Sequence, residues 1–363
     1  MTAPAGAGRL EGLDAIRAGA MLLGVVYHAT YAWLPDIAPW YLVADASAVP
    51  ALVAVTGVLH AFRMQLFFAL SGFFSHLVFE RRGPSGFVKD RGKRIVVPFL
   101  VALGPVLALD IAVRTWSRAS GLMSPAYEVQ DHLRPSPLHL WFLVYLFTFC
   151  VLAWLAPAWT GPSRAVRFVV TRFPPALLVL ALPTCVGLWL HPENRPDAHF
   201  WPMPFEVLHY GVFFAFGWWL WDVRGEARGL KRWAWPLTLA GAALAVFVFR
   251  GPLQWEATGH VLSGLVAWLL TLGPLGFALG DGETAVRRPA LRFLVEASYW
   301  VYLVHYPVVL ALQVFFATQP LPGLLEYLAT VVLTFSFAFV TFALFVRRTW
   351  LGPWLGVKPV EAK

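Results

Sequence analysis

Three ionisable side chains lie on one stripe of the first apolar segment. Arg17 and His28 are 11 residues apart, so on a helix they lie about 20° from each other around the axis and about 16 Å apart along it. Asp14 precedes Arg17 by one turn. An imidazole within an apolar segment can transfer protons, and a guanidinium at its end can bind an anion. The alternative is an i,i+3 ion pair and a histidine that only packs.

Further polar side chains fall within or beside later apolar segments. They are His60, Arg63, His139, Trp141, Glu206, Tyr302 and His305. Each one alone is more typical of a structural residue. Together they predict a polar cavity that opens to one side of a membrane, with Asp14, His28 and His305 as the catalytic candidates and the others as substrate ligands.

Residues 80–94, which we expect to form a loop, are the densest basic cluster. Arg91, Lys93 and Arg94, together with Arg17, are candidates for binding a polyanion such as a nucleotide diphosphate, because arginine binds phosphate oxygens bidentately. The cluster is equally typical of a cytoplasmic loop that contacts anionic lipid headgroups. The sequence contains no Walker loop, dinucleotide fingerprint or zinc motif, so we predict neither a metal site nor a permanently bound cofactor.

The composition excludes a soluble globular enzyme. Of 363 residues, 59% are hydrophobic and only 13% are charged, whereas soluble domains carry about 25% charged residues. Too little polar surface remains to face water on all sides. The net charge of +8 does not indicate nucleic-acid binding, because the basic residues are dispersed between apolar segments.

The elements that must position the polar residues are therefore membrane-spanning helices. A span needs about 20 mostly apolar residues. We expect spans near residues 16–35, 55–79, 95–113, 138–158, 174–191, 204–222, 234–250, 258–280, 293–317 and 324–346. The predicted fold is an all-α bundle of about ten transmembrane helices. It forms one domain over residues 1–363, with short cytoplasmic tails at 1–12 and 347–363.

The basic residues predict the orientation of this bundle. With the N-terminus in the cytoplasm, the inner segments carry 22 of the 28 lysines and arginines, the outer segments carry five, and Arg63 lies within a span. Basic residues are retained on the cytoplasmic side of membrane proteins. Both termini are therefore expected in the cytoplasm.

Several of these runs resemble the acyltransferase 3 family of membrane enzymes. The family's opening segment is similar to LDAIRAGAMLLGVVYH (residues 13–28), and its second-span signature to HAFRMQLFFALSGFF (60–74). Its R-x-x-R element resembles RGKRIVVP (91–98). Its fourth-span and C-terminal motifs are similar to HLWFL (139–143) and SYWVYLVHYP (298–307). The order and spacing agree over most of the chain.

The resemblance implies an enzyme that takes an acyl group from cytoplasmic acyl-coenzyme A and places it on a sugar hydroxyl across the bacterial inner membrane. His28 falls on the family's essential first-span histidine. It either deprotonates the acceptor hydroxyl or is itself acylated first. Arg17, Arg91 and Arg94 would then hold phosphates or the acyl carboxylate.

The runs FRMQ, HLWFL and YLVHYP are most similar to family members that succinylate periplasmic glucans, so we expect succinyl-coenzyme A and such a glucan as substrates. Residues 192–203 and the neighbourhood of Glu256 show no such similarity. The alternative within the same class is acetylation of another envelope polysaccharide. A secondary transporter is the alternative from another class, but the inverted repeats that it predicts are not found in the sequence.

The orientation is open to a direct test. In intact cells, single cysteines introduced at Ser47 and Ala126 should react with a membrane-impermeant thiol reagent, and cysteines at Ser85 and Gly225 should not. The reason is that the basic segments around the latter two positions are predicted to be cytoplasmic. Labelling of position 85 from outside would reverse the orientation.

Overall fold

The computed structural model describes residues 7–130, 136–155, 161–172, 176–191, 199–251, 253, 256–280, 289–349, 352, 355 and 357. Within these residues all regular structure is helical and no strand occurs. The predicted all-α class is therefore confirmed.

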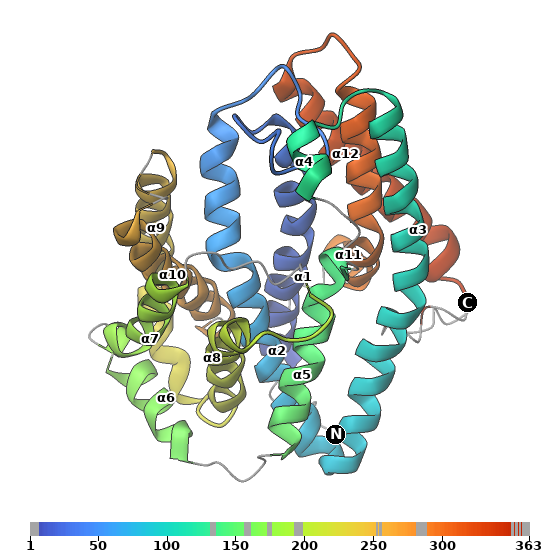
Figure 1. Ribbon diagram of the computed structural model, residues 1–363. Coiled ribbons are helices and arrows are strands. Elements are labelled where there is room, and N and C mark those ends of the chain that lie inside the picture. Colours follow the sequence, from blue (N-terminus) through green and yellow to red (C-terminus); the bar gives the residue numbers. More distant parts are fainter. Residues whose placement is uncertain are drawn as a thin grey trace.

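Ten longer helices in the described part of the chain follow the order of the ten predicted spans (Figure 1). They are α1 (Ala7–Ala29), α2 (Ala51–Arg91), α3 (Val97–Ala119), α5 (Trp141–Leu155), α7 (Ala176–Leu190), α8 (Pro204–Leu220), α9 (Lys231–Phe249), α10 (Ala257–Gly280), α11 (Pro289–Phe316) and α12 (Gly323–Thr341). Two short helices, α4 (Pro125–Gln130) and α6 (Gly161–Thr171), lie in the connections between them.

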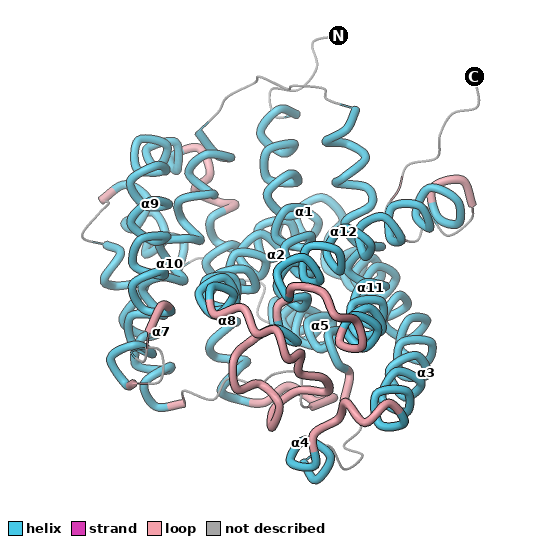
Figure 2. The backbone as a smooth tube through the Cα atoms, turned by 90° about the horizontal axis from the view of Figure 1, so that it is seen from above, coloured by secondary structure: helices cyan, strands magenta, loops and turns pink. Residues whose placement is uncertain are grey.

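Helix α1 is the central element of the bundle. It packs against α2, α10, α11 and α12, and the view from above shows it among these helices, with α3 and α9 at the periphery (Figure 2). A helix in this position can present side chains to several neighbours at once. The stripe that carries Arg17 and His28 is therefore held inside the protein.

Within the described residues, six helical segments are long and apolar enough to cross a membrane. They are Ala51–Ala119, Leu138–Leu155, Lys231–Phe249, Ala257–Leu279, Pro289–Phe316 and Gly323–Val346. The first of them contains both α2 and α3, which run in opposite directions (Figure 1).

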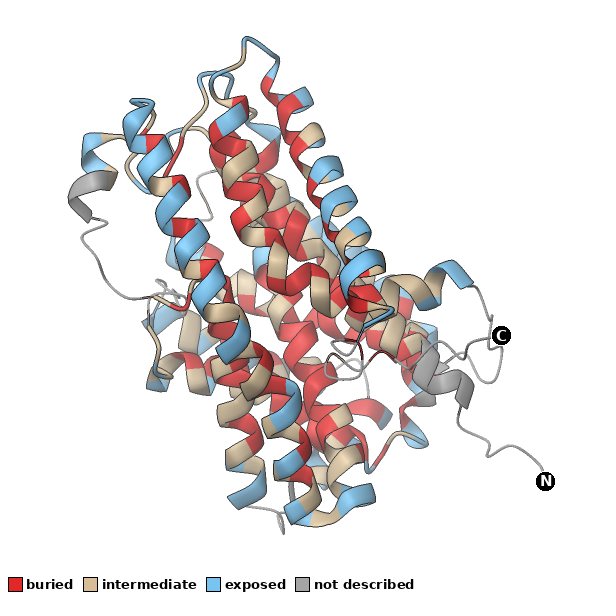
Figure 3. Cartoon of the chain, turned by 90° about the vertical axis from the view of Figure 1, so that its right-hand side faces the viewer, coloured by how far each residue is buried: buried red, intermediate tan, exposed pale blue. Residues whose placement is uncertain are grey.

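Large apolar side chains also face outward from the described helices. Examples are Leu100 on α3, which is 62% exposed, and Val340 on α12. Figure 3 shows such exposed positions along the outer helices and buried ones between the helices. An extensive apolar exterior is suited to lipid. The chain is a multi-pass membrane protein; the number of crossings and the sides of the termini stay predictions.

Residues 80–94 are helical, which corrects the expectation of a loop. Helix α2 continues to Arg91, and Gly83, with a φ of 67°, divides it into two helical parts. Glycine adopts this backbone conformation readily, and Pro84 then begins the second part, where a missing N–H costs nothing. A turn of π-helix, Gly92–Val96, leads into α3. The basic cluster is therefore held on helices.

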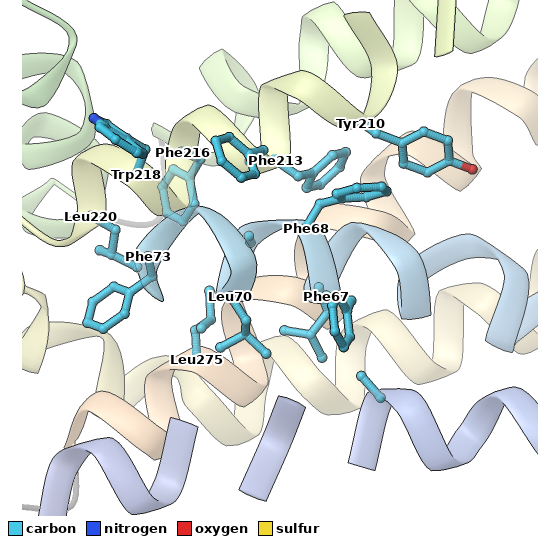
Figure 4. Packing of buried hydrophobic residues seen from close by; sticks show 14 of the residues in the cluster. Phe67, Phe68, Leu70, Phe73, Tyr210, Phe213, Phe216, Trp218, Leu220 and Leu275 are labelled. Carbon is cyan, nitrogen blue, oxygen red and sulfur yellow. The ribbon is translucent and has the colours of Figure 1, made fainter. Parts of the chain in front are cut away.

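Helices α2 and α8 touch backbone to backbone at two glycines. A Cβ atom on Gly72 would overlap the carbonyl oxygen of Phe214, and one on Gly217 would overlap that of Ala69. Small residues allow this close approach in membrane helices. Aromatic side chains from both helices, including Phe68, pack around the contact (Figure 4).

We expect Gly72→Ala to lower the thermal unfolding midpoint of the purified protein. Its methyl group would overlap Phe214, and overpacking of this kind costs about 1–3 kcal/mol. The matched control is Gly104→Ala on α3, where no atom lies within 4 Å of the new Cβ and alanine favours the helix. Equal midpoints for the two variants would contradict the close contact.

Candidate active site

His28 lies in the last turn of α1, which ends at Ala29 and not near residue 35 as predicted. The helix stops there because its final carbonyl groups have partners outside it. The side-chain amide of Gln313 on α11 donates to the carbonyl oxygens of His28 and Ala29, both at 3.1 Å. The Tyr41 hydroxyl in turn donates to Oε1 of Gln313 at 3.0 Å. Helix α11 thus fixes the position of His28.

Helix α11 also places His305 and Tyr306 against the His28 ring. The ring centroid of His28 lies 5.3 Å from that of His305 and 5.1 Å from that of Tyr306. Nδ1 of His305 lies 2.7 Å from the carbonyl oxygen of Tyr302. A carbonyl only accepts, so Nδ1 carries the proton and Nε2, which is buried without a hydrogen bond, is an acceptor.

In the described part of the chain the His28 imidazole makes no side-chain hydrogen bond, and the residue is only partly buried. The alternative was a histidine that only packs. An imidazole held in place by its backbone, with its nitrogens unengaged, can instead exchange a proton with a bound molecule.

His139, from the turn before α5, completes a group of three histidines. Its ring centroid lies 5.0 Å from that of His305 and 5.2 Å from that of Tyr306. Its Nε2 donates to the carbonyl oxygen of Leu303 at 3.2 Å, and the Tyr302 hydroxyl donates to the His139 carbonyl oxygen at 2.9 Å. Among the residues that the structure describes, no group of three or more His, Cys, Asp or Glu side chains could hold a metal ion.

Helix α2 adds Arg63 and His60 to this group. The guanidinium carbon of Arg63 lies 5.0 Å from the centre of the Tyr27 ring. Its charge acts on His28, His60 and His305. Nδ1 of His60 lies 3.1 Å from the Tyr27 hydroxyl oxygen, yet the side chain remains exposed. The predicted substrate ligands Arg63, His60, His139 and Tyr302 are therefore brought together beside His28.

Trp141 and Glu206, the other predicted substrate ligands, lie elsewhere. The Trp141 ring packs 5.4 Å from that of Tyr210. Glu206, in the first turn of α8, is buried, and its Oε2 has no hydrogen bond. Within the described ranges neither side chain contacts the three histidines. Their predicted role as substrate ligands remains a prediction.

In the N-terminal half of α1, Arg17 pairs with Asp14 at 2.7 Å, as their spacing predicts. Arg91 and Arg94 lie close enough to act electrostatically on Arg17. Asp14 precedes His28 by 14 residues on the same helix, which separates them by about 21 Å. The structure therefore does not bring Asp14, a predicted catalytic residue, to the histidines.

Asp90, which was not among the predicted site residues, organises the basic cluster. Its carboxylate is only 5% exposed and lies 2.6 Å from Arg91, 2.8 Å from Arg82 and 3.2 Å from Arg94. The i,i+4 spacing of Asp90 and Arg94 is the sequence signal that could have identified it. Lys93 is exposed and makes no ion pair within the described residues.

Comparison with known proteins gives matches over most of the chain. Residues 10–343 match the family model described as "Acyltransferase domain", the acyltransferase 3 family. The chain is similar to "Glucans biosynthesis protein C" from Salmonella paratyphi B and from Salmonella agona, with 25% identity over 92% of this chain and 91% of each relative. No solved structure gives a significant match.

We expect Asp90→Asn to destabilise the protein, because the change leaves three arginines around a buried position without a counter-ion. Removing one partner of a buried ion pair costs about 3–5 kcal/mol. The control is Glu226→Gln, which breaks an exposed pair with Arg167 worth less than about 1 kcal/mol. Thermal unfolding in one detergent measures both variants. A larger decrease in the unfolding midpoint for Glu226→Gln than for Asp90→Asn would contradict the role of Asp90.

Proposed function

The chain belongs to the acyltransferase 3 family, and from that premise we propose that it transfers an acyl group from acyl-coenzyme A to a hydroxyl group of a glycan. The matched relatives are named glucans biosynthesis protein C, and this name supports a periplasmic glucan as the acceptor. We propose succinyl-coenzyme A as the donor, taken from the cytoplasmic side of the bacterial inner membrane.

The observation that carries this proposal is the free imidazole of His28 beside His305 and Tyr306. In the proposed reaction His28 accepts the proton of the acceptor hydroxyl as its oxygen attacks the thioester carbonyl carbon. A C–O ester bond forms and the C–S bond breaks. The proton then passes to the departing coenzyme A sulfur. General bases of this kind contribute about 100-fold to 10,000-fold.

His305 has a supporting role in this proposal. Its Nδ1–H is held by the Tyr302 carbonyl, so its ring is fixed with Nε2 free to accept. A fixed neighbouring ring restricts the orientations that the His28 ring can take. We assign to His305 the orientation of His28 or of the acceptor sugar.

The basic cluster is the proposed site for the coenzyme. Arg91 and Arg94 lie close enough to act electrostatically on Arg17, and guanidinium groups bind phosphate oxygens through paired hydrogen bonds. Arg17 precedes His28 by about 16 Å along α1. The pantetheine arm of coenzyme A spans a distance of this order. A donor whose phosphates rest on Arg17 would therefore present its thioester near His28.

The test is acyl transfer by the purified protein from labelled succinyl- or acetyl-coenzyme A to glucan. We expect ester-linked label on the glucan, with succinyl preferred. Absence of transfer from either donor, together with substrate flux across proteoliposomes, would overturn the proposal in favour of a transporter.

His28→Ala should reduce this turnover by at least about 100-fold, because it removes the general base, while donor affinity by isothermal titration stays nearly unchanged. His305→Ala serves as the comparison, and it should reduce turnover less than His28→Ala does. A His28→Ala enzyme that retains more than about a tenth of wild-type turnover would contradict the assignment and favour His305 as the base.

A further inference from the structure

Arg63 is a buried cation without a counter-ion. The residue is 9% exposed, and its Nε is buried without a hydrogen bond. Among the described residues it forms neither an ion pair nor a hydrogen bond. An isolated buried charge is strongly unfavourable unless it is paired. A buried, unpaired guanidinium of this kind favours the binding of an anion.

The surroundings of Arg63 compensate for its charge only in part. Its guanidinium lies over the Tyr27 ring, an arrangement that stabilises a cation. The tyrosine side chains that lie close enough to interact electrostatically with it are Tyr27, Tyr31, Tyr210 and Tyr302. Tyrosine hydroxyls are neutral at physiological pH. They shape a polar site but supply no negative charge.

Other arginines of the proposed active site already have carboxylate partners. Arg17 pairs with Asp14, and Arg91 and Arg94 pair with Asp90. These ion pairs belong to the proposed coenzyme site, which includes Arg17 of α1. Among the described residues Arg63, which lies close to the three histidines, has no carboxylate partner. An anion that arrives with the substrate would therefore be attracted to it.

The position of Arg63 relates this anion to the reacting group. A Cβ atom on Gly24 would lie 3.2 Å from an Nη of Arg63 and 3.8 Å from Nε2 of His305. The guanidinium and the His305 ring therefore meet at the same small patch of α1, one turn before His28. Because His28 follows Gly24 by four residues, an anionic group seated on Arg63 would lie about 6 Å along α1 from the proposed base.

We propose that Arg63 binds the free carboxylate of a dicarboxylic acyl group, and so selects half-thioesters such as succinyl-coenzyme A over neutral acyl donors. The inference rests on the proposed acyl transfer. The guanidinium fork matches a carboxylate through two parallel hydrogen bonds. Because Gly24 has no side chain, the space beside the Arg63 guanidinium stays open.

The test is the ratio of kcat/KM for succinyl-coenzyme A to that for acetyl-coenzyme A. Arg63→Gln should lower this ratio about 10-fold to 100-fold, as expected for the loss of one charge-assisted contact. The control is Arg17→Gln, which should weaken both donors alike and leave the ratio unchanged. An equal loss for both donors in Arg63→Gln would overturn the proposal and assign Arg63 to the oxyanion of the transition state.

Two additions keep the outcome decisive. If Arg63→Gln fails to fold, Gly24→Ala should lower the same ratio, because its methyl group crowds the guanidinium; an unchanged ratio would refute the carboxylate site.

Isothermal titration of both donors separates this inference from the proposed function. A protein that binds succinyl-coenzyme A more tightly only while Arg63 is present, yet transfers neither acyl group, would retain the carboxylate site and lose the proposed reaction. Equal affinities in the wild type would overturn the site.

Discussion

The side-chain amide of Gln313 donates two hydrogen bonds to the last carbonyl groups of α1, and the arrangement of the candidate site depends on them. Backbone carbonyl groups that end a helix within an apolar interior need a partner, because no water is present to provide one. Gln313 meets that need and ends α1 directly after His28. The same helix, α11, carries His305 and Tyr306. One connection between two helices therefore sets both the position of the proposed base and the position of its neighbours.

A second constraint is the pairing of charge inside the bundle. Asp14 with Arg17, Asp110 with Arg114 at 2.6 Å, and Asp90 with three arginines place carboxylates next to the cations that they stabilise. Arg63 departs from this pattern. Arg63 is buried beside the histidines and has no such partner among the described residues, and we propose that a ligand carboxylate supplies it.

The close contact of α2 and α8 serves the same site from a distance. Gly72 and Gly217 allow the two backbones to touch, which brings the aromatic side chains of both helices into one cluster. Arg63 and His60 lie on α2 on the N-terminal side of this contact. Their placement against α1 therefore depends on the packing of α2 against α8.

The sequence by itself determined the properties that depend on short stretches of chain. Apolar length and low charge established the all-α membrane class, and the i,i+3 spacing predicted the Asp14–Arg17 pair, because one helical turn brings such residues together without help from the rest of the fold. The tertiary structure alone decided the rest. It ended α1 at Ala29 through a residue 285 positions away, turned residues 80–94 into helix, and brought His28, His139 and His305 together from three segments. These features are set by helix packing, in which each contact depends on side chains far apart in the chain, and no local spacing records which helices become neighbours.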